Sequence, residues 1–292
     1  MRRILVTGAN KGIGLAIATA ILEEHADTFV LLGARSEPRG REAVDGLVRE
    51  RSAFRERVQR VTLDVVSDES VARAAKSIAQ SFPGELRPLH ALVNNAGIGS
   101  DDLSATLNVN VLGIRRVCEA FIPLLDPAAG RIVNVTSAAG PNFVDGCSPE
   151  RQRFFRDPNV TWPALAALMD ECLAIDGGKT AFAARGLGDG NAYGLSKACA
   201  NSYTMLLARE HPSLRINACT PGFIETDMTK GYAVSQNKSP AEIGMKPPSA
   251  GAVAPTHLLF GDLEGNGHYY GSDAQRSPLD RYRAPGDPPY TD

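Results

Sequence analysis

Short apolar runs alternate along this chain with longer stretches in which apolar residues recur every three or four positions. Runs of the first kind predict β-strands, and stretches of the second kind predict helices. The predicted strands are Ile4–Thr7, Thr28–Gly33, Val58–Asp64, Ala91–Asn94, Arg131–Thr136, Arg215–Cys219 and a possible last one at His268–Tyr270. The predicted helices are Leu15–Leu22, Glu42–Ser52, Glu69–Ser81, Val109–Leu125, Ala192–Arg209 and roughly Ala250–Phe260. This alternation predicts an α/β fold: one doubly wound domain over residues 1–292 with a parallel, seven-stranded sheet.

The segment from residue 141 to residue 190 breaks this alternation, because it is too long for a connection between a strand and a helix. Two helix starts occur within it. Ser148-Pro149-Glu150 has an N-cap, a proline at the first helical position and an early acid. Thr161 precedes a second helical run, Ala164–Ile175, which Gly177-Gly178 would end. We therefore expect a helical insertion with two helices.

Composition narrows the class of protein. A hydrophobic fraction of 43% and a charged fraction of 22% are those of a soluble globular domain. A net charge of −2 gives no electrostatic reason to expect nucleic acid or an anionic membrane as a partner. The five cysteines are scattered without a CxxC pair, and the five histidines show no metal-ligand spacing. We therefore expect reduced thiols in a cytoplasmic protein and no metal site.

The two ends of the chain carry no targeting or anchoring pattern. Met1-Arg2-Arg3-Ile4 runs directly into the first predicted strand, which leaves no room for a signal peptide. No apolar run approaches the length of a membrane span. From Ser277 the chain has four prolines and several charges, which predicts an irregular C-terminal arm, either packed on the surface or frayed.

A glycine-rich turn near the start of the chain is typical of nucleotide binding. The apolar strand Ile4-Leu5-Val6 runs into three glycines, and an Ala- and Ile-rich helix follows. Gly8 allows a tight turn and Gly12 lets the backbone approach a pyrophosphate. The helix N-terminus offers unpaired N–H groups and a positive dipole end. This is the context of the Rossmann dinucleotide fingerprint, although the spacing is GxxxGxG rather than GxGxxG.

Tyr193 and Lys197 lie four residues apart, which places both side chains on one face of a predicted helix. A phenol has an unperturbed pKa of about 10, and a cation beside it favours the phenolate and lowers that pKa. The pair is therefore a candidate general acid or base with its tuning charge. A tyrosine and a lysine on a solvated helix face would show the same spacing, so the pair needs support from the rest of the chain.

That support comes from motifs that follow one another along the chain. They are TGxxxGxG at Thr7–Gly14, Asn94-Asn95-Ala96-Gly97, Asn110, Ser137, Tyr193-x-x-x-Lys197 and Pro221-Gly222. Together these motifs resemble the short-chain dehydrogenase/reductase family, and the likeness covers about residues 1–270. The long insertion before the tyrosine is similar to the carbonyl reductase branch, which includes menthone and salutaridine reductases. Enzymes of that branch reduce ketones or aldehydes with NADPH and are mostly monomeric.

The resemblance implies a catalytic tetrad of Asn110, Ser137, Tyr193 and Lys197. Ser137 follows a strand and so lies at the carboxyl edge of the sheet, where such folds bind ligands. It would hold the substrate carbonyl oxygen, which Tyr193 would protonate as hydride arrives at carbon. Lys197 would bind the nicotinamide ribose and lower the pKa of Tyr193. Asn110 would order a helix backbone and a water that feeds protons to the lysine.

The resemblance also implies cofactor contacts. The stretch after the fourth strand would support the sheet and face the adenosine, and Asp64 would accept from the adenine amino group, although a strand-ending aspartate is often only a turn residue. The residues after Thr226, to about Lys246, would form a mobile lid. The expected cofactor residues are Gly8, Asn10, Lys11, Gly12, Ile13, Gly14, Arg35, Arg39, Asp64, Val65, Asn94, Ala96, Gly97, Tyr193, Lys197, Pro221, Gly222, Ile224 and Thr226.

The end of the second strand indicates which cofactor is used. An NAD enzyme places an acid about 20 residues after the glycine turn, where it binds the ribose hydroxyls. Here Arg35 stands in that region, and its guanidinium can stack on adenine and pair with a 2′-phosphate. Lys11 and Asn10 lie on the same side, Arg39 adds a second charge, and Glu37 lies past the usual acid position. These residues predict NADP(H).

The predicted function is therefore NADPH-dependent reduction of a ketone or aldehyde, with Tyr193 as general acid. The same residues would serve oxidation of a secondary alcohol of terpene, steroid or alkaloid type, and an NADPH-binding sensor without turnover is a third reading. We expect a monomer, because the insertion would cover the helix face through which other family members associate. In the insertion, Trp162, Phe154 and Phe155 either wall a hydrophobic substrate cleft or pack the insertion onto the body.

Overall fold

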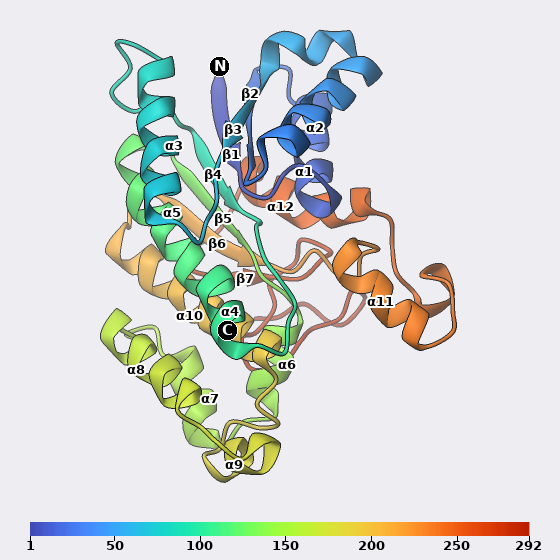
Figure 1. The fold of residues 1–292 in the computed structure, drawn as a ribbon. Helices are drawn as coiled ribbons and strands as arrows, with labels where there is room; N and C mark the ends of the chain where they lie inside the picture. Colours follow the sequence, from blue (N-terminus) through green and yellow to red (C-terminus); the bar gives the residue numbers. More distant parts are fainter. Residues whose placement is uncertain (292) are drawn as a thin grey trace.

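A parallel sheet of seven strands forms the centre of the protein (Figure 1). The structure, a computed structural model, describes residues 1–291. The strands lie in the order β3-β2-β1-β4-β5-β6-β7, and each neighbouring pair is parallel. The winding reverses between β1 and β4, so the sheet is doubly wound, as predicted. The strands are β1 (Arg2–Val6), β2 (Thr28–Ala34), β3 (Val58–Thr62), β4 (Ala91–Asn94), β5 (Arg131–Val135), β6 (Arg215–Cys219) and β7 (Tyr269–Tyr270).

Helices cover both faces of this sheet (Figure 1). On one face lie α1 (Gly12–Glu24), α2 (Glu37–Glu50) and α12 (Val253–Phe260), and on the other lie α3 (Asp68–Ser81), α5 (Gly113–Phe121) and α10 (Ala192–Glu210). Successive side chains of a strand point to opposite faces, so Ile4 packs in the first core and Leu5 in the second. Short 3₁₀ turns at Ser52–Arg57, Ile122–Leu124, Ala241–Ile243 and Pro248–Ala252 complete the connections.

Several helices begin earlier than the apolar pattern predicts. The helix expected to begin at Val109 is preceded by α4 (Leu103–Leu107) and a π-helical turn (Asn108–Leu112), which lead directly into α5. Asp102 caps α4 by accepting a hydrogen bond from the backbone N–H of Ala105. The predicted start was wrong because this N-terminal cap lies ahead of the strongly apolar stretch.

The insertion is helical, but it holds more helices than the two predicted. Within the described part of this segment we find α6 (Ala139–Asp145), α7 (Pro149–Arg156), α8 (Trp162–Leu173) and α9 (Gly178–Ala184). The starts predicted from Ser148 and Thr161 are confirmed, since each side chain accepts a hydrogen bond from the first turn of its helix. The glycine pair does not directly follow the end of α8, and Gly178 is already the first residue of α9.

The aromatic residues of the insertion pack it onto the body of the protein. Phe155 is buried among core side chains. The ring of Trp162 meets Tyr203 of α10 edge to face, at 5.7 Å between centroids, and the Arg115 guanidinium of α5 lies 3.9 Å over it. Of the two roles open for these aromatics, the structure supports packing. The insertion therefore lies on the face formed by α10, α5 and α4 (Figure 1).

The C-terminal arm is packed rather than frayed over residues 277–283. Ser277 and Arg283 are buried, and the Ser277 hydroxyl accepts a hydrogen bond from the Arg283 backbone N–H. The Arg283 guanidinium pairs with Asp273. Asp280 forms an ion pair with Arg156 of α7 at 2.9 Å, so the arm also contacts the insertion.

Candidate active site

The motifs found in the sequence meet at one edge of the sheet, because the carboxyl ends of parallel strands lie on the same side. The loop after β4 is joined to the glycine turn after β1. The Thr7 hydroxyl accepts hydrogen bonds from the backbone N–H groups of Asn95 and Ala96, each at 3.0 Å. The Asn95 amide donates to the Thr7 carbonyl at 2.9 Å and to the Gly8 carbonyl at 3.3 Å. Asn95 belongs to the quoted motif but not to the expected cofactor residues, and it holds the two loops together.

The glycine turn has the conformation that a dinucleotide pyrophosphate requires. Gly8 and Gly12 adopt positive φ angles of 63° and 56°, which L side chains rarely adopt. At Gly14, a Cβ atom would lie 2.5 Å from the Gly8 carbonyl oxygen, so a side chain there has no room. The first turn of α1 follows at once, with its unpaired N–H groups facing the turn. These residues fit a bound dinucleotide.

Four predicted catalytic residues are brought together beside this turn. Ser137 follows β5, and its side chain lies close enough to Tyr193, in the first turn of α10, to influence the pKa of the phenol. The Lys197 ammonium lies 5.5 Å from the centroid of the Tyr193 ring and donates to the Val135 carbonyl at 3.3 Å. The spacing of four residues on one helix therefore does place phenol and ammonium on the same face.

Asn110 completes the group from the π-helical turn, a form of helix that often marks functional sites. Its amide donates to the Ile98 carbonyl at 2.9 Å and to the Ser196 hydroxyl at 3.0 Å, and its oxygen accepts from the Ile98 N–H at 3.0 Å. A Cβ atom at Gly97 would lie 3.1 Å from the Asn110 oxygen and 3.4 Å from the Lys197 nitrogen. Because Gly97 has no side chain, the side chains of Asn110 and Lys197 can both lie close to the backbone there.

The pKa values of the pair differ from the expectation drawn from the sequence. Burial raises the pKa of the Tyr193 phenol above its usual value, and the hydrogen bond with Ser137 opposes this shift only in part. Burial also lowers the pKa of Lys197 to about 8. The expected lowering of the tyrosine pKa by the lysine is therefore not found. A raised pKa keeps the phenol protonated at neutral pH, which is the form that a proton donor needs.

Some of the expected cofactor residues have structural roles. The Asn94 side chain is buried within the sheet, where its amide donates to the Asn134 oxygen at 2.8 Å, so it supports the strands. One oxygen of Asp64 accepts from the backbone N–H of Val66, as in an ordinary turn. Thr226 caps α11 (Asp227–Ser235), since Thr226 and Thr229 bond each other's backbone. Cofactor contacts by these residues stay a prediction.

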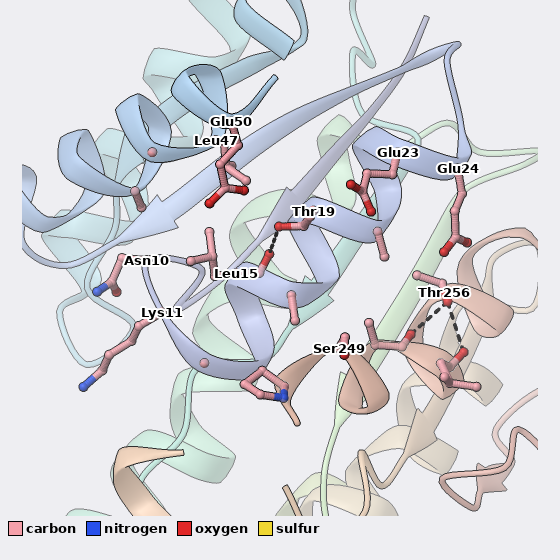
Figure 2. A pocket seen from close by; sticks show the side chains of 18 of the residues that line it. Asn10, Lys11, Leu15, Thr19, Glu23, Glu24, Leu47, Glu50, Ser249 and Thr256 are labelled. Carbon is pink, nitrogen blue, oxygen red and sulfur yellow. Dashed lines mark hydrogen bonds between the residues drawn. The ribbon is translucent and has the colours of Figure 1, made fainter. Parts of the chain in front are cut away.

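Two of the basic residues expected at the 2′-phosphate, Lys11 and Arg39, line an open groove of about 1200 Å³. The groove follows the outer face of α1, between α2 and α12, and does not include the catalytic tetrad. Figure 2 shows Asn10 and Lys11 at the end of α1 where the glycine turn lies, and Glu24 at the other end. Arg39 lines the groove, and both Arg39 and Arg35 are exposed.

Residues of the segment after β6 contribute an apolar surface that the sequence did not reveal. Met228 of α11 lies 3.3 Å from the position of a Cβ atom at Gly99, and the Tyr193 ring lies 4.0 Å from that same position. The neighbouring side chains of Phe223 and Tyr232 are more than one-third exposed and meet edge to face. The approach of Met228 to the Tyr193 ring could be recognised only once α11 was placed over the sheet edge.

Comparison with known proteins decides the family. A model of the family described as short chain dehydrogenase matches residues 2–149. Carbonyl reductase [NADPH] 1 of Rattus norvegicus is 32% identical over 271 residues, which cover 88% of this chain and 90% of that protein. The chain is a short-chain dehydrogenase.

Two solved structures have folds similar to that of this short-chain dehydrogenase over most of its length. Salutaridine reductase from Papaver somniferum has a TM-score of 0.74 and is 26% identical, with 92% of this chain and 99% of that chain covered. Menthone neomenthol reductase from Mentha piperita has a TM-score of 0.72 and is 26% identical, with 93% of this chain and 99% of that chain covered. The resemblance to these two reductases that the insertion indicates is confirmed.

Proposed function

We propose that this short-chain dehydrogenase is an NADPH-dependent carbonyl reductase that acts on a ketone or an aldehyde. The observation that carries the proposal is the cluster of Ser137, Tyr193 and Lys197 beside a glycine turn that fits a dinucleotide. Similarity to carbonyl reductase [NADPH] 1 over most of both chains supports the reaction class. The small-molecule carbonyl would lie beside Tyr193, under the apolar side chain of Met228.

The NADP(H) assignment is supported by charge at the adenosine end. Lys11, Arg35 and Arg39 would bind the 2′-phosphate, and the side chains of Arg35 and Arg39 are exposed. The first turn of α1 and Gly12 would bind the pyrophosphate. When bound, the cofactor supplies the hydride. The residues after β6, including Ile224, would contact the nicotinamide end.

Side chains of the protein would carry out the proton transfer. The Ser137 hydroxyl would donate to the substrate oxygen and hold it beside the Tyr193 phenol. The phenol, protonated at neutral pH because its pKa is raised, would give its proton to the same oxygen as charge develops there. Lys197, a cation below its pKa of about 8, would stabilise the phenolate that remains. Asn110 would position the helix and a water from which the proton is restored.

Similarity to carbonyl reductase [NADPH] 1 favours reduction over its reverse. Oxidation of a secondary alcohol would use the same side chains, with Tyr193 as the base. A sensor that binds NADPH without turnover has no use for a lysine ammonium placed beside the Tyr193 ring. The alcohol dehydrogenase and the sensor are therefore the second and third candidates.

We also infer a monomeric, cytoplasmic protein. The insertion packs on α10 and α4, which leaves that helix face covered within one chain. All five cysteines are free and buried, as suits a reducing compartment. None of the helices between residues 1 and 291 has the length and apolar character needed to cross a membrane.

A panel of ketones, aldehydes and quinones, each assayed with NADPH and with NADH, tests the proposal. We expect consumption of NADPH with at least one carbonyl class, and a kcat/KM at least about tenfold lower with NADH, because the 2′-phosphate contacts are then missing. Alcohols assayed with NADP⁺ form the comparison. Absorbance at the reduced-nicotinamide band would stay constant across the whole carbonyl panel if the protein were a sensor, and that result would refute the proposal.

A further inference from the structure

An ion pair joins the glycine turn to the segment that overhangs the active site. The Lys11 ammonium lies 2.5 Å from a carboxylate oxygen of Asp227, the first residue of α11. Both side chains are more than half exposed, at 59% and 66%, so an anion from solution can reach the lysine. Lys11 thus has a partner in the structure, although it is also expected to bind the 2′-phosphate.

The start of α11 is held firmly against the glycine turn at its base. The methyl group of Thr226 lies 3.6 Å from the position of a Cβ atom at Gly12. Side chains of Ile13 and Ile224 both lie 3.2 Å from the position of a Cβ atom at Gly251. The Lys11–Asp227 ion pair lies on the outer, exposed side of the contact between the glycine turn and the start of α11. This ion pair can therefore open without disturbing the buried packing.

Asp227 is surrounded by cations. The hydrogen bond and the charge of Lys11 are the largest causes that hold the pKa of Asp227 below its usual value, and Lys230 and Arg39 add to them. The aspartate is therefore ionised at neutral pH, among residues that are expected to receive the 2′-phosphate. Two anions that use one ammonium compete, because each repels the other.

We propose that Asp227 is the resident counter-ion of Lys11 and that the 2′-phosphate of NADP(H) replaces it. The inference rests on the proposed function, because it needs that phosphate to bind at Lys11. When the 2′-phosphate takes the place of Asp227 at Lys11, the outer side of α11 is released from the glycine turn. Met228 follows Asp227 directly and faces Gly99 near Tyr193, so this release changes the wall of the active site. NADH, which lacks the phosphate, leaves the pair closed.

Binding of two nucleotide fragments to the full-length chain tests the competition without any turnover. Calorimetry would measure Kd for 2′,5′-ADP and for 5′-AMP with wild type, Asp227→Asn and the control Asp27→Asn. The control removes the same charge from an exposed ion pair, that between Arg2 and Asp27. We expect Asp227→Asn to bind 2′,5′-ADP about two- to fivefold more tightly, the range of an exposed ion pair, with Kd for 5′-AMP unchanged. The control should match wild type for both.

Hydrogen exchange tests the release of α11 itself. We expect 2′,5′-ADP to speed exchange of the backbone amides of 227–235 in wild type, and 5′-AMP to leave them unchanged. In Asp227→Asn the exchange should already be fast and respond to neither fragment. If wild type prefers 2′,5′-ADP but Asp227→Asn changes neither affinity nor exchange, the inference is wrong while the NADP(H) assignment stands. If wild type binds both fragments equally, the NADP(H) assignment fails, and the inference fails with it.

Discussion

At the scale of single residues, the proposed proton donor is a tyrosine whose pKa is raised and whose neighbour is a lysine with a lowered pKa. Both shifts have one cause, the loss of hydration on burial. The spacing of Tyr193 and Lys197 could be predicted from the sequence, because it depends only on helix geometry. The direction of the tyrosine shift could not, because the burial of the phenol depends on how distant parts of the chain pack around it.

The lysine makes the reaction sensitive to pH. Lys197 is charged below its pKa of about 8 and neutral above it, so its support for the Tyr193 phenolate is lost as pH rises through 8. We expect kcat/KM for carbonyl reduction, which reports groups of the free enzyme, to fall between pH 7 and 9 with a midpoint near 8. Replacement of the exposed Lys76 by glutamine should leave the profile unchanged. A profile that stays flat to pH 10 would contradict this role of Lys197.

At the scale of elements, the ends of the strands and the insertion decide what the fold can do. The strands were predictable because central parallel strands are continuous apolar runs. The starts of α7 and α8 were predictable because Ser148 and Thr161 cap them locally. The π-helical turn and α11 were not, since neither has a local apolar pattern and each depends on contacts with distant loops. Asn110, for example, is held by Ser196 of α10.

The insertion makes a prediction about association. Because α7 and α8 pack on α10, and α8 also on α4, we expect one chain per particle. Sedimentation equilibrium over a wide range of concentrations should give a mass near 31.1 kDa throughout. A mass twice or four times as large, or one that rises with concentration, would show that another face of the molecule associates.

At the scale of the whole molecule, the order of motifs along the chain predicted both the family and the fold, and the structure adds how distant parts cooperate. The glycine turn, the loop after β4 and the start of α11 meet at one sheet edge, joined by Asn95 and by the Lys11–Asp227 pair. The sequence contains each of these residues, but their proximity follows only from the strand order. The segment that we propose to lie over the substrate, α11, has no pattern in its composition from which a substrate could be predicted.

Replacement of Tyr193 by phenylalanine tests the central claim, that this phenol donates the proton. We expect kcat for NADPH-dependent reduction of an accepted carbonyl to fall at least about a hundredfold, while Kd for NADPH stays within about twofold of wild type. Tyr203→Phe is the matched control, since Tyr203 is buried on the same helix, and it should keep its activity. Turnover by Tyr193→Phe close to that of wild type would contradict the account.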